Sequence, residues 1–95
     1  MSANTDSDKK RNEREEELND LRVILKLPEG RRIIWRLLGH CSVFESIWDP
    51  SSRIHKNAGR QDVGHFILGE VTEADDESLL KMMKEAKDKK GVSDV

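Results

Sequence analysis

Arginine side chains in the middle of the sequence are the groups best suited to chemistry. Residues 23–60 hold seven basic and three acidic residues, and five of the basic ones are arginines: Arg31, Arg32, Arg36, Arg53 and Arg60. A guanidinium binds phosphate or carboxylate through paired hydrogen bonds and also stacks on aromatic rings. All four aromatic residues lie in or just beyond the same stretch, at Trp35, Phe44, Trp48 and Phe66. The pattern predicts a surface that binds acidic groups.

Three kinds of acidic group could bind these five arginines, which we call the arginine strip. Residues 61–95 hold five basic and nine acidic residues, so pairing within the chain would dock the last part of the sequence onto the middle. The second candidate is another protein, and Trp48, which lies just before a turn, is the aromatic residue expected to contact it. Nucleic acid is the third, but a net charge of −2 argues against it, because dedicated nucleic-acid binders are strongly basic.

The segment from Gly59 to Gly64 has the glycine spacing that begins a phosphate-binding loop. In such a loop, a lysine and then a serine or threonine must follow to reach the phosphates and magnesium. Here His65 and Phe66 stand at those positions, and no strand precedes the segment. The spacing therefore favours helix packing over a nucleotide site.

Metal or nucleophile chemistry would have to use His40, Cys41, His55 and His65. None of these residues is paired at i, i+4 or in Cys-x-x-Cys spacing, and the adjacent side chains of His40 and Cys41 point about 100° apart on a helix. The lone cysteine excludes an internal disulfide and fits a reducing compartment. We expect no catalytic residue, no metal ion and no cofactor, and therefore a protein that is not an enzyme.

Length and composition describe one small helical domain. Of 95 residues, 35% are hydrophobic and 38% charged, against about 45–50% and about 25% in ordinary soluble domains. Such a domain folds alone only marginally, so association with itself or with a partner would help it. The longest apolar runs, of which 33–35 is one, are far shorter than the about 20 residues of a membrane span, and the first 17 residues are too polar for a signal peptide.

The elements that carry these residues are predicted to be all helical, forming a small bundle of about four helices with a flexible N-terminal arm. Residues 1–10 have no side chains whose burial could offset the conformational entropy lost when the chain becomes ordered, so we expect them to be disordered. A helix begins near Arg11 and ends before Pro28, and a second spans about 28–41. A short helical turn at 42–48 precedes a third helix that ends near Thr72. The fourth follows a cap at 75–78 and stops at Gly91.

These boundaries predict a single helical domain at 11–90, with an ordered core of about 23–87 and a loose tail at 91–95. The apolar faces of the four helices are Leu18, Leu21 and Leu25; Ile33, Ile34, Trp35, Leu37, Leu38 and Cys41; Val63, Phe66, Ile67 and Val71; and Leu79, Leu80, Met82, Met83 and Ala86. The second helix is the most apolar, so we expect it, with Trp35, at the centre of the core. Gly59, Gly64 and Gly69 predict either close helix packing or a later helix start near Gln61.

Several short segments, taken together, resemble a known family. They are Leu27-Pro28-Glu29-Gly30-Arg31-Arg32, Trp35-Arg36-Leu37-Leu38, Cys41, Val43-Phe44, Gly59-Arg60, Val63-Gly64 and the run Leu79-Leu80-Lys81-Met82-Met83-Lys84-Glu85-Ala86. In order and spacing, residues 25–87 resemble a family of small proteins from short-tailed double-stranded-DNA bacteriophages (podovirus type) and related prophages. The resemblance implies a phage or prophage origin and, from the usual position of these genes near head genes, a virion or head-assembly role.

The sequence thus predicts a non-enzymatic phage accessory protein that binds other phage structural proteins or a second copy of itself, and no membrane. Its partner-binding candidates are Arg31, Arg32, Arg36, Trp48, Arg53 and Arg60. We expect it in the host cytoplasm during assembly and in the virion if it is packaged. Two alternatives remain: a nucleic-acid-associated phage protein that uses the arginine strip, and a small modulator of a host protein.

Overall fold

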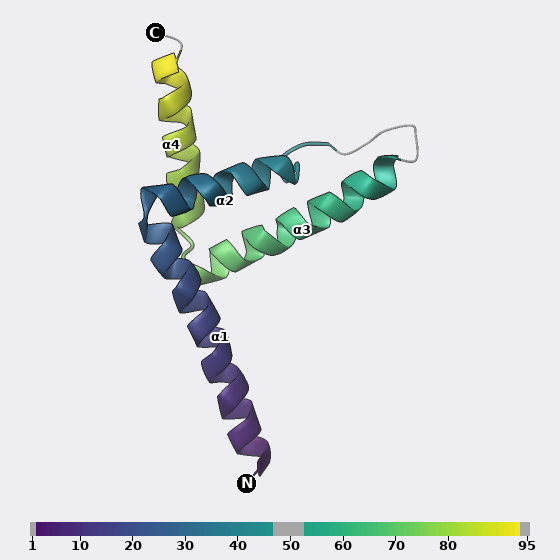
Figure 1. Ribbon diagram of the computed structural model, residues 1–95, viewed down its shortest axis with the longest axis vertical. Helices are drawn as coiled ribbons and strands as arrows, with labels where there is room; N and C mark the ends of the chain where they lie inside the picture. Colours follow the sequence, from purple (N-terminus) through teal and green to yellow (C-terminus); the bar gives the residue numbers. More distant parts are fainter. Residues whose placement is uncertain (1, 47–52, 94–95) are drawn as a thin grey trace.

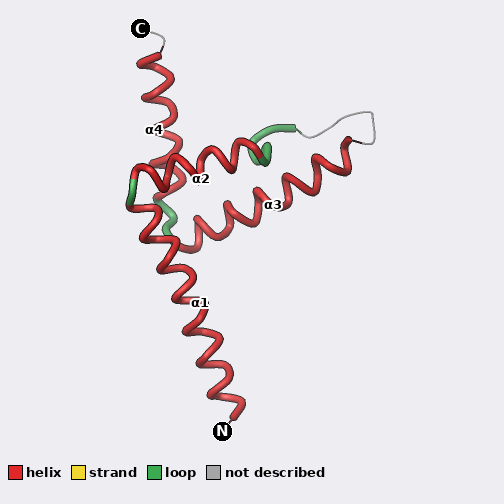
Figure 2. Tube along the Cα trace, viewed as in Figure 1, coloured by secondary structure: helices red, strands yellow, loops and turns green. Residues whose placement is uncertain are grey.

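The fold is a small all-α bundle, as predicted. A computed structural model describes residues 2–46 and 53–93, and the side chains of 6–46 and 53–89. Its helices are α1 (Ser2–Lys26), α2 (Pro28–His40), α3 (Arg53–Ala74) and α4 (Ser78–Ser93), and these described residues contain no strand (Figure 2). None of the helices in the same part of the chain is long and apolar enough to cross a membrane.

The molecule is flat, with helices that project in three directions. Figure 1 shows α2 and α3 extending to the same side, while α1 and α4 run in opposite directions from the place where the helices meet. The Cα positions extend over 60 × 38 × 16 Å. A flat shape leaves much of each helix exposed, so the core is confined to the region where the four helices meet.

That core is formed by residues from every helix: Leu18 and Leu25 of α1, Leu38 of α2, Val71 and Ala74 of α3, and Met82 of α4. The apolar face predicted for α2 is only partly buried. Leu38 and Cys41 are buried and Trp35 is half-buried, whereas Ile33 is 49% exposed and Leu37 42% exposed. The prediction that Trp35 lies inside the core is therefore corrected: it packs at the margin, because a flat bundle covers one side of α2 only.

The segment predicted to be disordered at residues 1–10 is helical over its described residues, 2–10. Helix α1 begins at Ser2, and the described side chains from Asp6 to Glu13 are all exposed. Once a helix is nucleated, each further residue adds one hydrogen bond without repeating the nucleation cost, so α1 extends N-terminally beyond its packed half. An exposed ion pair between Arg11 and Asp8 at 2.9 Å lies within this extension.

Pro28 ends α1 and starts α2, as predicted, and Gly30 lets the two helices meet closely. Leu27 is the N-cap of α2 in an extended conformation, and Pro28 occupies the first helical position, where its missing N–H is not needed. A Cβ on Gly30 would fall within 2.8 Å of the Ile24 carbonyl carbon and nearer still to its oxygen. The sharp change of direction between α1 and α2 therefore requires glycine at this position.

The helical turn predicted at 42–48 is instead the C-terminal cap of α2. Ser42 adopts a left-handed conformation (φ 55°), its N–H donates to Gly39 O, and the N–H of Val43 donates to Leu38 O at 3.3 Å. This is the Schellman arrangement, which ends a helix rather than continuing it. Gln61 Nε2 donates to Ser42 O at 2.9 Å and thereby ties the cap to α3. The rest of that prediction, from Ile47 onward, lies outside the described residues.

Helix α3 packs through Gly64, while the other predicted packing glycines face open space. A Cβ on Gly64 would lie 2.5 Å from Cys41 Cβ and closer still to Val43 Cγ2, whereas nothing lies within 4 Å of one at Gly59 or Gly69. The apolar face predicted for α3 is partly wrong. Val63 is 55% and Phe66 65% exposed, because the packed face is centred on Gly64 and Val71.

Helix α4 begins at the predicted acidic cap. Asp75 Oδ1 accepts a hydrogen bond from the Glu77 N–H at 3.1 Å, and its Oδ2 accepts one from the Ser78 hydroxyl at 2.9 Å. The predicted stop at Gly91 is wrong, since the helix continues to Ser93. Leu80 and Met83, predicted to lie inside, are 69% and 43% exposed because the helical rotation of about 100° per residue turns both away from the side of α4 that carries Met82.

Two glycine substitutions in α3 should have opposite effects on stability. Gly64→Ala should lower the free energy of unfolding by about 1–3 kcal/mol, because its methyl group would overlap Cys41 and Val43. Gly69→Ala, the matched control in open space, should raise it by about 0.5–1 kcal/mol by restricting the unfolded chain. Urea unfolding followed by circular dichroism measures both, and stabilisation by both would contradict the packing assigned to Gly64.

Candidate functional site

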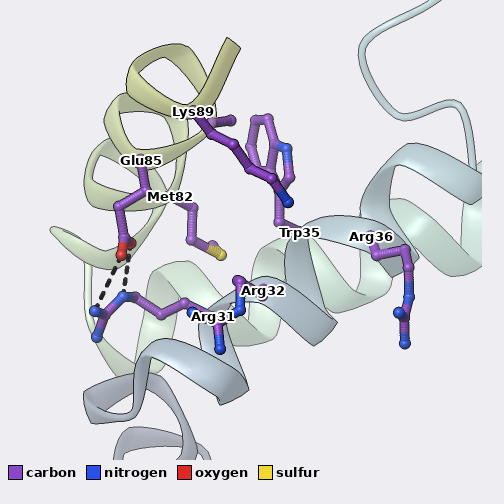
Figure 3. A pocket seen from close by; sticks show the side chains of 8 residues that line it. Arg31, Arg32, Trp35, Arg36, Met82, Glu85 and Lys89 are labelled. Atoms are coloured by element: carbon purple, nitrogen blue, oxygen red, sulfur yellow. Dashed lines mark hydrogen bonds and ion pairs between the residues drawn. The ribbon is translucent and has the colours of Figure 1, made fainter. Parts of the chain in front are cut away.

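A basic groove lies between α2 and α4. It has a volume of about 870 Å³ and is lined by Arg31, Arg32, Trp35 and Arg36 of α2 and by Met82, Glu85, Ala86 and Lys89 of α4 (Figure 3). Ligand-binding clefts in proteins span about 300–1,000 Å³. The groove is therefore large enough to hold several side chains of a partner.

Helical spacing explains how these residues come to line one groove. The α2 residues stand at i, i+1, i+4 and i+5, and those of α4 at i, i+3, i+4 and i+7, so each set lies along one side of its helix. Helix α4 packs against both α2 and α3, with Met82 in the core. The buried Met82 thus fixes the rotation of α4 that turns Glu85 and Lys89 toward α2.

Arg31 and Glu85 form the ion pair that joins the two walls. The Arg31 Nε lies 2.7 Å from Glu85 Oε1 and its Nη2 3.2 Å from Oε2, while Nη1 donates to Leu25 O at 2.8 Å. Arg31 is only 5% exposed. The hydrogen bonds from Arg31 lower the pKa of Glu85 and raise that of Arg31 itself. The guanidinium of Arg31 is therefore engaged within the chain.

The charge of the groove opposes that of the whole protein. Four cationic residues and one carboxylate line it, which leaves a net +3 on a chain of net −2. Arg32 lies 3.6 Å from Glu29, but both side chains are more than 60% exposed, so the attraction is weak. Arg36 is exposed and forms no ion pair within the described part of the chain. Arg32 and Arg36 are thus accessible to an acidic ligand.

The floor of the groove is apolar and aromatic. Trp35 packs against Phe44 with ring centroids 5.7 Å apart, and Phe44 itself is 51% exposed. Figure 3 shows Lys89 extending from α4 toward Trp35, and Arg36 pointing away from α4. A tryptophan beside cationic groups can hold both the apolar and the acidic parts of a ligand.

The other predicted site residues lie elsewhere. Arg53 and Arg60 are on α3 and do not line the groove; Arg60 is half-buried and donates to Asn57 Oδ1 at 2.8 Å. Trp48 lies outside the described residues. The glycine-spaced segment from Gly59 to Gly64 is helical and so forms no loop that could enclose a phosphate.

The structure groups no metal ligands in the part of the chain it describes. The three histidines are exposed, Cys41 is buried with a free thiol, and no cluster of three histidine, cysteine or acidic side chains is present among the described residues. Glu85 and Lys89 were not predicted as site residues. The only feature of the sequence that pointed to them was the contrast in charge between its basic middle and its acidic last third.

A second ion-pair network lies away from the groove and holds α1 on α3. Arg14 Nη2 lies 2.5 Å from Glu70 Oε2 and 2.7 Å from Glu73 Oε2. The hydrogen bond from Arg14 lowers the pKa of Glu70 and raises the pKa of Arg14. Close to this network, Arg22 Nε donates to Ala74 O at 2.7 Å. These contacts position the packed half of α1 only.

Stability should depend on the ionised forms of Glu70 and Glu85. Both carboxyls have a pKa lowered from the ordinary value of 4.5, so their contribution is present above pH 4.5 and is lost as the pH falls through the lowered values. Glu85→Gln and Glu70→Gln should each lower stability at pH 7 and flatten its decline in acid. Glu16→Gln, at an exposed position, should do neither. Urea unfolding between pH 3 and 7 measures these effects, and parallel pH curves for all variants would contradict them.

Comparisons with known proteins give one family match. Residues 21–84, from the second half of α1 into α4, match the model of a family described as Bbp19-like phage protein. The comparisons with curated proteins and with solved structures found no match.

Proposed function

The chain belongs to the Bbp19-like phage protein family, and from this premise we propose that it is a non-enzymatic accessory protein of phage head assembly or of the virion. In this proposal it acts by contact with other phage structural proteins. It works in the host cytoplasm while particles assemble and enters the virion if it stays bound.

The observation that carries the proposal is the basic groove with its aromatic floor. A net +3 around Trp35 suits a protein segment that carries acidic and apolar side chains together. Nucleic acid is a poorer ligand for it, because Glu85 lies within the groove and the protein as a whole is acidic. The groove lining has no hydroxyl, thiol or imidazole side chain, and its one carboxylate is held by Arg31, which supports a binding role over catalysis.

Charge reversal in the groove should prevent incorporation into phage particles. Arg32→Glu with Arg36→Glu keeps the buried Arg31–Glu85 pair intact, so the protein should fold while its groove repels an acidic segment. The control is Lys84→Glu with Lys87→Glu, two exposed positions of α4 that do not line the groove. Mass spectrometry of purified virions and heads should detect the wild type and the control, and at least tenfold less of the groove variant.

Other outcomes would contradict the proposal in distinct ways. If the groove variant were incorporated as well as the wild type, the groove would not be the surface that contacts the phage proteins. Absence of the wild type from particles and assembly intermediates would favour a host protein as the target. Tight, steeply salt-dependent binding of duplex DNA by the wild type, lost in the groove variant, would favour the nucleic-acid alternative.

A further inference from the structure

The exposed side of α1 carries a row of acidic side chains. Glu13, Glu16 and Asp20 stand at i, i+3 and i+7, so they lie along one side of the helix and span about 10 Å. All three are exposed, and none forms an ion pair or a side-chain hydrogen bond within the described part of the chain. We call these three residues the acidic row.

The acidic row lies opposite to the packed side of α1. Arg14, Leu18 and Leu25 face the rest of the molecule, through the ion pairs of Arg14 with α3 and through the burial of the two leucines. Charged groups pointing away from the core contribute little to the fold. The row is therefore available to another molecule.

The basic groove has the complementary character. Arg32 and Arg36 are one helical turn apart, about 6 Å along α2, and Lys89 lies on the opposite wall. Three carboxylates spaced over about 10 Å of a helix can meet the two exposed arginines on the α2 wall of such a groove. Trp35 and Ala86 between the walls provide apolar surface for the methylene groups of glutamate side chains.

Within one molecule the row cannot reach the groove. Helix α1 turns sharply into α2 at Leu27 and Pro28, and its N-terminal half runs away from α4 (Figure 1). Contact between the two surfaces therefore requires two copies of the chain.

We propose that the acidic row of one copy docks into the basic groove of a second copy, head to tail. This inference rests on the proposed function in so far as both use the same groove, and it names a second copy of the chain as the occupant. Because the two surfaces are different, the first contact leaves a free groove on the copy that supplied its row and a free row on the copy that supplied its groove. Such an interface extends into a ring or a filament, or closes when two copies exchange rows.

Purified full-length protein tests the proposal by sedimentation velocity and light scattering over a concentration series. The wild type should associate with a dissociation constant of about 10 μM, and more weakly as salt is raised. Two variants, Arg32→Glu/Arg36→Glu and Glu13→Arg/Glu16→Arg/Asp20→Arg, should each associate at least about 100-fold more weakly, because like charges then face each other. Asp62→Arg, at an exposed position of α3, is the control and should associate as the wild type does.

Mixing the two variants is the decisive step. In the mixture the reversed row meets the reversed groove, and the unchanged row meets the unchanged groove, so association should return to within about tenfold of the wild type. A mixture that stays monomeric, or wild-type association that neither variant weakens, would overturn the proposal. A monomeric wild type whose virion incorporation still depends on Arg32 and Arg36 would overturn self-association and leave the proposed function standing.

Discussion

Burial of the Arg31 guanidinium is the constraint on which the arrangement of the helices depends. A charge that is only 5% exposed must have its hydrogen bonds satisfied within the protein, and Arg31 finds acceptors on two other helices. It donates to the carbonyl of Leu25 near the end of α1 and to the carboxylate of Glu85 in α4. Because Glu85 is 40% exposed, loss of the pair would cost about 2–3 kcal/mol, toward or below the lower end of the range for buried pairs.

The same ion pair creates the groove and sets its charge. It holds α2 and α4 together at one end, where Glu85 neutralises one arginine. Arg32, Arg36 and Lys89 line the groove with Trp35. The flat shape of the bundle then keeps these groups at the surface, since no further helix among the described residues covers them. A small chain with few buried side chains can in this way present a large, strongly patterned surface.

Local signals in the sequence predicted the helices better than their packing. Pro28 and the cap at Asp75 mark helix starts through backbone geometry alone, so both were predictable. Whether Val63 or Gly64 faces the core depends on the cap of α2, whose Val43 and Cys41 press against Gly64 from more than 20 residues away. The pairing of Arg31 with Glu85, 54 residues apart, was visible only as a difference in charge between segments. Identifying the partners required the rotation of α4, which no local pattern specifies.

The packed centre of the bundle and the two helix ends that project from it differ in how they could affect partner specificity. The family match covers residues 21–84, which contain the joint of α1 with α2, the packed face of α3 and most of the core. The acidic row and Lys89 lie outside that range, on the two ends that project from the bundle. The side chains of the acidic row and of Lys89 are exposed, so changing their charge costs the fold little, while it changes which surfaces attract one another. A fold built this way can keep its centre and alter its partners through the charges on its ends.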